Sequence, residues 1–192
     1  MNSSNQEENR AVSSPKDVFM QLLVIIALYI SAVSFGLLLF NYIDLWFPDP
    51  LVDFYARTSG SIRWALASLT IVFPVYLWLA WTLAREMGRD PAKRELKIRK
   101  WLVYFTLFAA AVIIIGDLVT LIYNFLNGDL SARFVLKVVS VLAIALAVFV
   151  YYIWNLKQGT AALLDSRMRW FVWVVTAVVV AATVSGFFVV GS

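Results

Sequence analysis

The sequence predicts an all-α protein, a polytopic transmembrane bundle of five spanning helices. Hydrophobic residues make up 62% of the 192-residue chain and charged residues only 15%, which is too little charge to cover a water-soluble domain of this length. Five apolar stretches each reach the about 20 residues that a membrane helix needs. We expect a polar, disordered tail over residues 1–14 and one transmembrane helical domain over residues 15–192. The predicted helices cover residues 18–43, 62–84, 101–125, 132–156 and 169–190.

Polar and helix-breaking residues inside the first two helices predict how they pack. Ser31, Ser34 and Asn41 fall near one face of the first helix, so we expect that face to point into the bundle. Pro74 lies near the centre of the second helix and predicts a kink, because a proline removes one backbone hydrogen bond. We interpret this kink as a structural bend in preference to a functional hinge.

The distribution of basic residues predicts the orientation in the membrane. If five helices alternate in direction, twelve of the 16 Lys and Arg residues fall on one side and four on the other. By the positive-inside rule the N-terminus then lies in the cytoplasm and the C-terminus outside. The densest basic cluster lies between the second and third helices. We expect contacts with anionic lipid headgroups from its members Arg94, Lys97, Arg99 and Lys100.

The residue types that are absent exclude much of enzyme chemistry. The chain has no cysteine and no histidine, so disulfides, thiolate or imidazole metal sites and His-based nucleophile activation are excluded. It also lacks a glycine-rich phosphate loop. The net charge of +4 is explained by membrane orientation, so we expect no nucleic-acid partner. We predict no catalytic site, no metal and no cofactor.

One acid, Asp117, lies deep inside the apolar segment 101–125. An ionised carboxylate at such a depth costs a few kcal/mol on insertion scales, so an intramembrane acid is a candidate functional residue. Spacings of three and four residues place it in a stripe along one helix face, which must face protein or water. The stripe consists of Thr106, Ala110, Ile113, Asp117, Thr120 and Asn124.

Three interpretations of Asp117 are open. It forms a structural ion pair with Lys137, which lies in the next helix beyond a short turn at Gly128. Alternatively, it is a protonatable or cation-coordinating carboxylate beside a wet cavity, with Lys137 modulating it. A third possibility is a polar contact with another subunit. The other residues expected to line the cavity are Thr120, Asn124, Ser31, Ser34 and Asn41.

Three short sequences resemble a family of small bacterial multi-pass membrane proteins that is catalogued only as a domain of unknown function. They are FPDP at residues 47–50, GSIRWALASL at 60–69 and FPVYL at 73–77. The resemblance covers roughly the first four helices. It implies a bacterial multi-helix membrane protein and carries over no active-site residue.

Two functions follow from these observations. The first is a scaffold or accessory protein of the bacterial inner membrane that acts by interaction, as a homo-oligomer or with another membrane protein. The second is a homo-oligomeric channel or transporter for an ion or small solute that uses Asp117. We expect an oligomer because a chain of only five helices needs several copies to enclose a path for the solute.

Overall fold

The computed structural model describes residues 15–47, 54–89, 97–128, 130–158 and 166–191. Within these ranges the chain is all-helical. The helices are α1 (Pro15–Trp46), α2 (Phe54–Arg89), α3 (Lys97–Leu126), α4 (Ala132–Gln158) and α5 (Ser166–Gly191). Each contains a stretch long and apolar enough to cross a membrane. The predicted tail of residues 1–14 lies outside the described residues.

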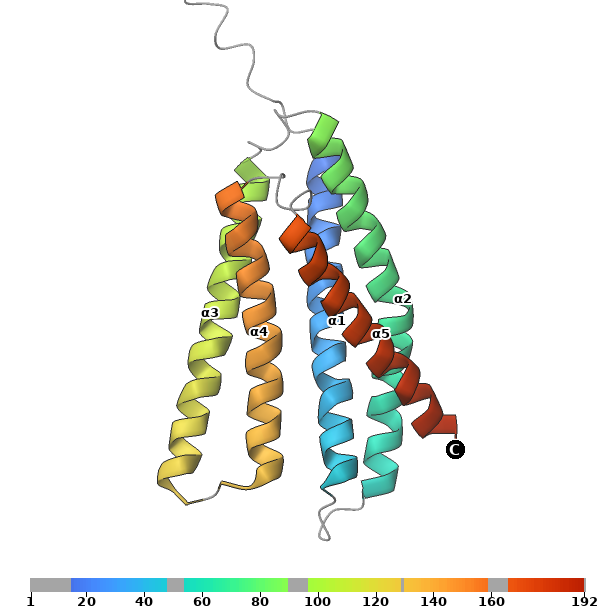
Figure 1. Ribbon diagram of the computed structural model, residues 1–192, viewed down its shortest axis with the longest axis vertical. Helices are drawn as coiled ribbons and strands as arrows, with labels where there is room; N and C mark the ends of the chain where they lie inside the picture. Colours follow the sequence, from blue (N-terminus) through green and yellow to red (C-terminus); the bar gives the residue numbers. More distant parts are fainter. Residues whose placement is uncertain (1–14, 48–53, 90–96, 129, 159–165, 192) are drawn as a thin grey trace, which may run out of the picture.

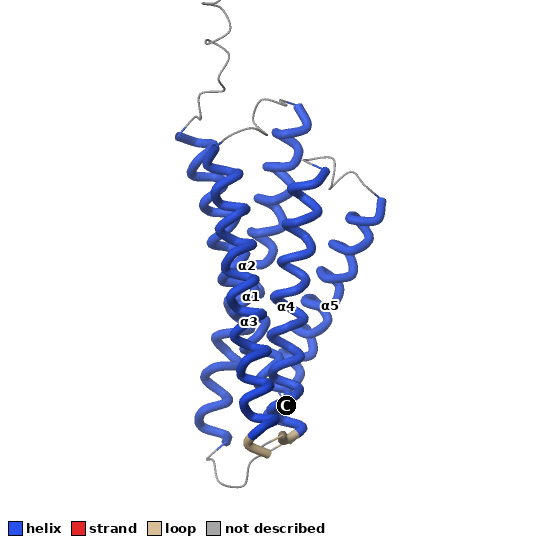
Figure 2. Tube along the Cα trace, turned by 90° about the vertical axis from the view of Figure 1, so that its left-hand side faces the viewer, coloured by secondary structure: helices blue, strands red, loops and turns tan. Residues whose placement is uncertain are grey.

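The helices run side by side along the long axis of the molecule (Figure 1). Successive helices alternate in direction, so α1 begins at the end of the bundle opposite to the one at which α5 ends. We call the end where α1 begins the inner end, after the charge-based prediction, and the other the outer end. The helices α1 and α2 form one pair, α3 and α4 form another, and α5 lies across one face of the α1–α2 pair (Figures 1 and 2).

The helix boundaries differ from the prediction at several ends. Helix α1 runs from Pro15 to Trp46 where residues 18–43 were expected, and α2 runs from Phe54 to Arg89 where residues 62–84 were expected. The second helix continues through Gly88, although glycine often follows the end of a helix. A glycine costs only about 1 kcal/mol inside a helix, too little to end it by itself.

Helix α1 holds the bundle together because every other helix makes a polar contact with it. On α2, Ser61 Oγ donates to Asn41 Oδ1 at 2.8 Å. On α3, Thr106 Oγ1 accepts a hydrogen bond from Tyr29 at 3.0 Å. On α4, two cations contact Asp44, and on α5 the carbonyl oxygen of Ala182 accepts from Tyr42 at 2.6 Å.

Small residues let α5 approach α1 and α2 near the outer end. A Cβ atom placed on Gly186 would lie 2.6 Å from Leu66 Cδ2 and 3.0 Å from the hydroxyl oxygen of Tyr42. The same hydroxyl lies 2.8 Å from Ser185 Oγ. A side chain at position 186 would therefore force its neighbours to shift, so glycine at this position allows the close approach of α5.

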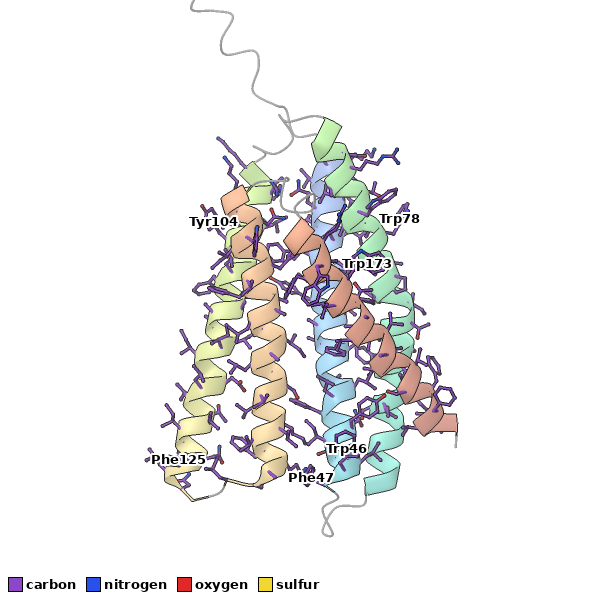
Figure 3. All side chains as sticks on the ribbon, viewed as in Figure 1. Trp46, Phe47, Trp78, Tyr104, Phe125 and Trp173 are labelled. Atoms are coloured by element: carbon purple, nitrogen blue, oxygen red, sulfur yellow. The ribbon has the colours of Figure 1, made fainter. Side chains whose placement is uncertain are left out.

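Large apolar side chains cover the outside of the bundle along its length (Figure 3). Trp46 and Phe125 lie towards the outer end, while Trp78, Tyr104 and Trp173 lie in the inner half. Tryptophan and tyrosine favour the two borders of a bilayer. A surface of this kind is suited to hydrocarbon, so the fold defines a multi-pass membrane protein.

Candidate functional site

The carboxyl group of Asp117 makes no hydrogen bond or ion pair with the part of the chain that the structure describes. Its Oδ2 atom is inaccessible and makes no hydrogen bond, and Asp117 forms no ion pair with any residue of the described ranges. The buried residues of α3 are Leu102, Val103, Thr106 and Ala110, all of which lie in the inner half of the helix. Asp117 therefore lies where α3 leaves the core of the bundle.

Polar and small residues surround Asp117 on the exposed part of α3. Thr120 is exposed and donates to the carbonyl oxygen of Gly116 at 2.8 Å, and Asn124 Nδ2 donates to the carbonyl oxygen of Thr120 at 2.9 Å. Gly116 is exposed, and a Cβ atom placed on it would meet no atom within 4 Å. We call the group formed by Ile113, Gly116, Asp117, Thr120 and Asn124 the outer α3 patch.

The predicted ion pair between Asp117 and Lys137 is wrong. Lys137 Nζ lies 2.7 Å from Oδ1 of Asp44 at the outer end of α1. Arg133 Nε also contacts this oxygen at 2.7 Å, and the Lys137 ammonium lies 5.4 Å from the centre of the Phe40 ring. One acid thus joins two cations of α4 to α1.

Depth in the membrane explains the choice of partner. Asp117 lies nine residues before the end of α3, whereas Lys137 lies five residues after the start of α4. At 1.5 Å per residue this difference of four residues separates them by roughly 6 Å along the axis. Asp44 lies only two residues before the end of α1, at the border that the cations of α4 also occupy.

Ser31, Ser34 and Asn41 of α1 are buried, as predicted, and Asn41 bonds within the bundle. Asn41 Nδ2 donates to the carbonyl oxygen of Leu37 at 2.6 Å, and its Oδ1 accepts from Ser61. The hydroxyl oxygens of Ser31 and Ser34 are buried and have no hydrogen-bond partner. Their face therefore does point inward.

The structure does not bring the predicted lining residues into one cavity. A cavity of about 370 Å³ between α1, α2, α4 and α5 includes Ser31, but its lining is almost entirely apolar and does not include Asp117, Thr120 or Asn124. Those three residues belong to the outer α3 patch. Thr106, the innermost polar residue of the predicted stripe, is fully buried and contacts Tyr29.

The expected lipid-contacting residues have different surroundings. Lys97 and Lys100 are exposed at the start of α3, whereas the Arg99 guanidinium donates to Asn155 Oδ1 of α4. Arg94 lies outside the described residues. Pro74 is exposed within α2, which continues through it without a break, and the predicted kink stays a prediction.

The turn between α3 and α4 contains Gly128, as predicted, and leads to a cap at Ser131. Gly128 has a φ of 77°, the left-handed conformation that favours glycine. Ser131 caps α4, because its Oγ accepts the backbone N–H of Phe134 at 3.2 Å.

Sequence reasoning missed Asp44, Arg133 and Gly116. Asp44 directly follows the predicted end of the first helix at residue 43, and its position at the same border as two cations was the available signal. Gly116 and Thr120 are four residues apart, a spacing of small residues that favours close approach of membrane helices. This signal was also present in the sequence.

Residues 17–152 match the family model described as "Domain of unknown function (DUF5671)". The match covers most of the chain, and this multi-pass membrane protein belongs to that family. The resemblance found from the sequence is confirmed, including its extent over α1 to α4. No curated protein and no solved structure matches the chain.

We predict that Asp44→Asn destabilises the protein, because Arg133 and Lys137 then lose their shared counter-charge. Hydrogen bonds to charged groups contribute about 1.5–3 kcal/mol, so the free energy of unfolding in detergent should fall by about 2 kcal/mol. Lys137→Met should cost much less in the Asp44→Asn background than in the wild type.

The comparison of Asp44→Asn, Lys137→Met and the double variant is a double-mutant cycle. Its control is a second cycle in which Asp117→Asn takes the place of Asp44→Asn. The effects of Asp117→Asn and Lys137→Met should add, since the two side chains do not contact each other. Coupling between positions 117 and 137, with additivity between 44 and 137, would contradict the assigned pairing.

Proposed function

We propose that this protein is an interaction protein of the bacterial inner membrane that self-associates through the outer α3 patch. In this role it acts as a scaffold or as an accessory component for another membrane protein. The observation that carries the proposal is the exposure of Gly116 and Thr120 beside Asp117, whose buried Oδ2 atom has no hydrogen-bond partner among the described residues. Such residues are costly against lipid and favourable in a helix contact.

The outer half of α3 has little cover from its own chain. Ile113, Val119 and Ile122 are each at least half exposed, and the buried residues of α3 end at Ala110. Apolar side chains at such positions are compatible with contact to lipid, whereas contact of the polar members of the patch with lipid is costly. A second protein surface on the patch would remove this mismatch.

A second copy of the chain fits this patch for a geometric reason. In a two-fold dimer with its axis along the membrane normal, residues of equal number meet at equal depth. The amide of Asn124 carries N–H donors and an acceptor oxygen. A neutral carboxyl group at Asp117 likewise carries one O–H donor and an acceptor oxygen. Each can therefore bond to its own copy, while Gly116 and Thr120 allow the two α3 helices to approach closely.

Substitution of the patch should weaken self-association. Interhelical hydrogen bonds in membranes contribute about 0.6–2 kcal/mol each, so Asn124→Ala should lower the association constant by roughly 3- to 30-fold. The measurement is energy transfer between labelled copies in vesicles, followed as lipid dilutes the protein.

Ile122→Ala is the matched control, because Ile122 is exposed on the side of α3 opposite to Thr120 and Asn124 and offers no polar group. It should leave association unchanged. A protein that stays monomeric at every dilution, or loss of association with Ile122→Ala alone, would overturn the proposal.

A second candidate function is a channel or transporter for an ion or small solute. The same unpartnered carboxyl group of Asp117 favours it, since several copies meeting at α3 would gather these acids around one axis. This function requires the same assembly and adds a path through it.

Flux into proteoliposomes separates the two functions. If the protein transports an ion, Asp117→Asn should reduce the flux under an imposed gradient, while Asp44→Gln, reconstituted to the same amount of folded protein, should retain it. Absence of flux under several ion gradients, with assembly intact, would count against transport and leave the interaction role standing.

A further inference from the structure

The large cavity is a slot with a mouth on the surface of the bundle. Along α4 its lining runs from Ser140 to Tyr152, and along α5 from Phe171 to Val179. Helices α4 and α5 both border the cavity but barely contact each other. The lining residues Ala143, Val174 and Val178 are exposed, so the slot opens sideways between α4 and α5.

The dimensions and chemistry of the slot fit a hydrocarbon chain. Its volume is about 370 Å³, and the twelve residue steps from Ser140 to Tyr152 correspond to roughly 18 Å at 1.5 Å each. One leaflet of a bilayer provides about half of the 30 Å hydrocarbon thickness. Aliphatic and aromatic side chains form nearly all of the lining.

Cationic side chains lie at the inner end of the slot. On α5 the exposed Arg169 and Trp170 immediately precede the first lining residue, Phe171. On α4 the lining ends at Tyr151 and Tyr152, which also border a smaller cavity of about 50 Å³ together with Arg99 and Asn155. An apolar slot with positive charge at its interfacial end matches an amphiphile with a negative headgroup.

We propose that the slot between α4 and α5 binds an acyl chain of an anionic phospholipid, whose headgroup lies beside Arg169 at the inner end. The phospholipid enters sideways from the membrane through the mouth at Ala143 and Val178. The bound acyl chain packs against the apolar lining of the slot. It thereby takes the place of the direct contacts that α4 and α5 barely make with each other. This site is separate from the outer α3 patch and does not depend on self-association.

Photolabelling of the intact protein tests this site. The probe is phosphatidylglycerol with a photoreactive group in one acyl chain, and the comparison is phosphatidylcholine with the same chain. Label from phosphatidylglycerol should concentrate on the facing peptides of α4 and α5 that line the slot. Label spread evenly over all exposed apolar residues, such as Phe108 and Ile115 of α3, would overturn the proposal.

Two variants close the slot at different depths. Ala147→Phe fills its interior and Ala143→Phe obstructs its mouth, and each should reduce labelling of the slot several-fold. Because Ala143 is exposed, the second variant tests the site even if the first fails to fold. Ala181→Phe on the exposed part of α5 is the control and should label as wild type. Unchanged labelling in Ala143→Phe would overturn the proposal.

The headgroup is tested separately. Arg169→Ala should remove the preference for phosphatidylglycerol over phosphatidylcholine while the slot still labels. Equal labelling by both lipids in the wild type would overturn the assignment of an anionic headgroup. Recovery of a different apolar molecule from the purified protein by native mass spectrometry, in place of a phospholipid, would overturn the proposed occupant.

Discussion

The structure depends on four polar side chains of α1 that bond to the other helices: Tyr29, Asn41, Tyr42 and Asp44. Polar groups without hydrogen-bond partners are costly in hydrocarbon. Side chains of α1 form hydrogen bonds or ion pairs with all four other helices. Tyr29 reaches α3, Asn41 reaches α2, and Tyr42 reaches α5. Asp44 receives both cations of α4. Because these contacts come from one helix, α1 sets the positions of the others.

The same constraint makes Asp117 an exception. Its buried Oδ2 atom has no hydrogen-bond partner among the described residues, and it lies beyond the last buried residue of α3, beside the exposed Gly116 and Thr120. The slot between α4 and α5 is a second place where the chain leaves a surface uncovered. The two places differ in chemistry: the first is polar and suits another helix, whereas the second is apolar and suits a lipid chain.

Much of the fold was predictable because hydrocarbon imposes simple rules. Long apolar runs must be helices, a buried Ser34 must face protein, and Gly128 suits a tight turn; the structure confirms all three. The partner of Lys137 was not predictable by the same rules. Spacing gives the face on which a residue lies, but helix tilt and depth decide whether Asp44 or Asp117 comes within reach.

Cross-linking in native membranes tests self-association through α3 most directly. The chain has no cysteine, so Thr120→Cys places one thiol on the outer α3 patch and Ile115→Cys places one on the opposite side of the helix. We expect mild oxidation to give a disulfide-linked dimer with Thr120→Cys and little or none with Ile115→Cys. Equal cross-linking at both positions, or cross-linking at position 115 alone, would contradict the account.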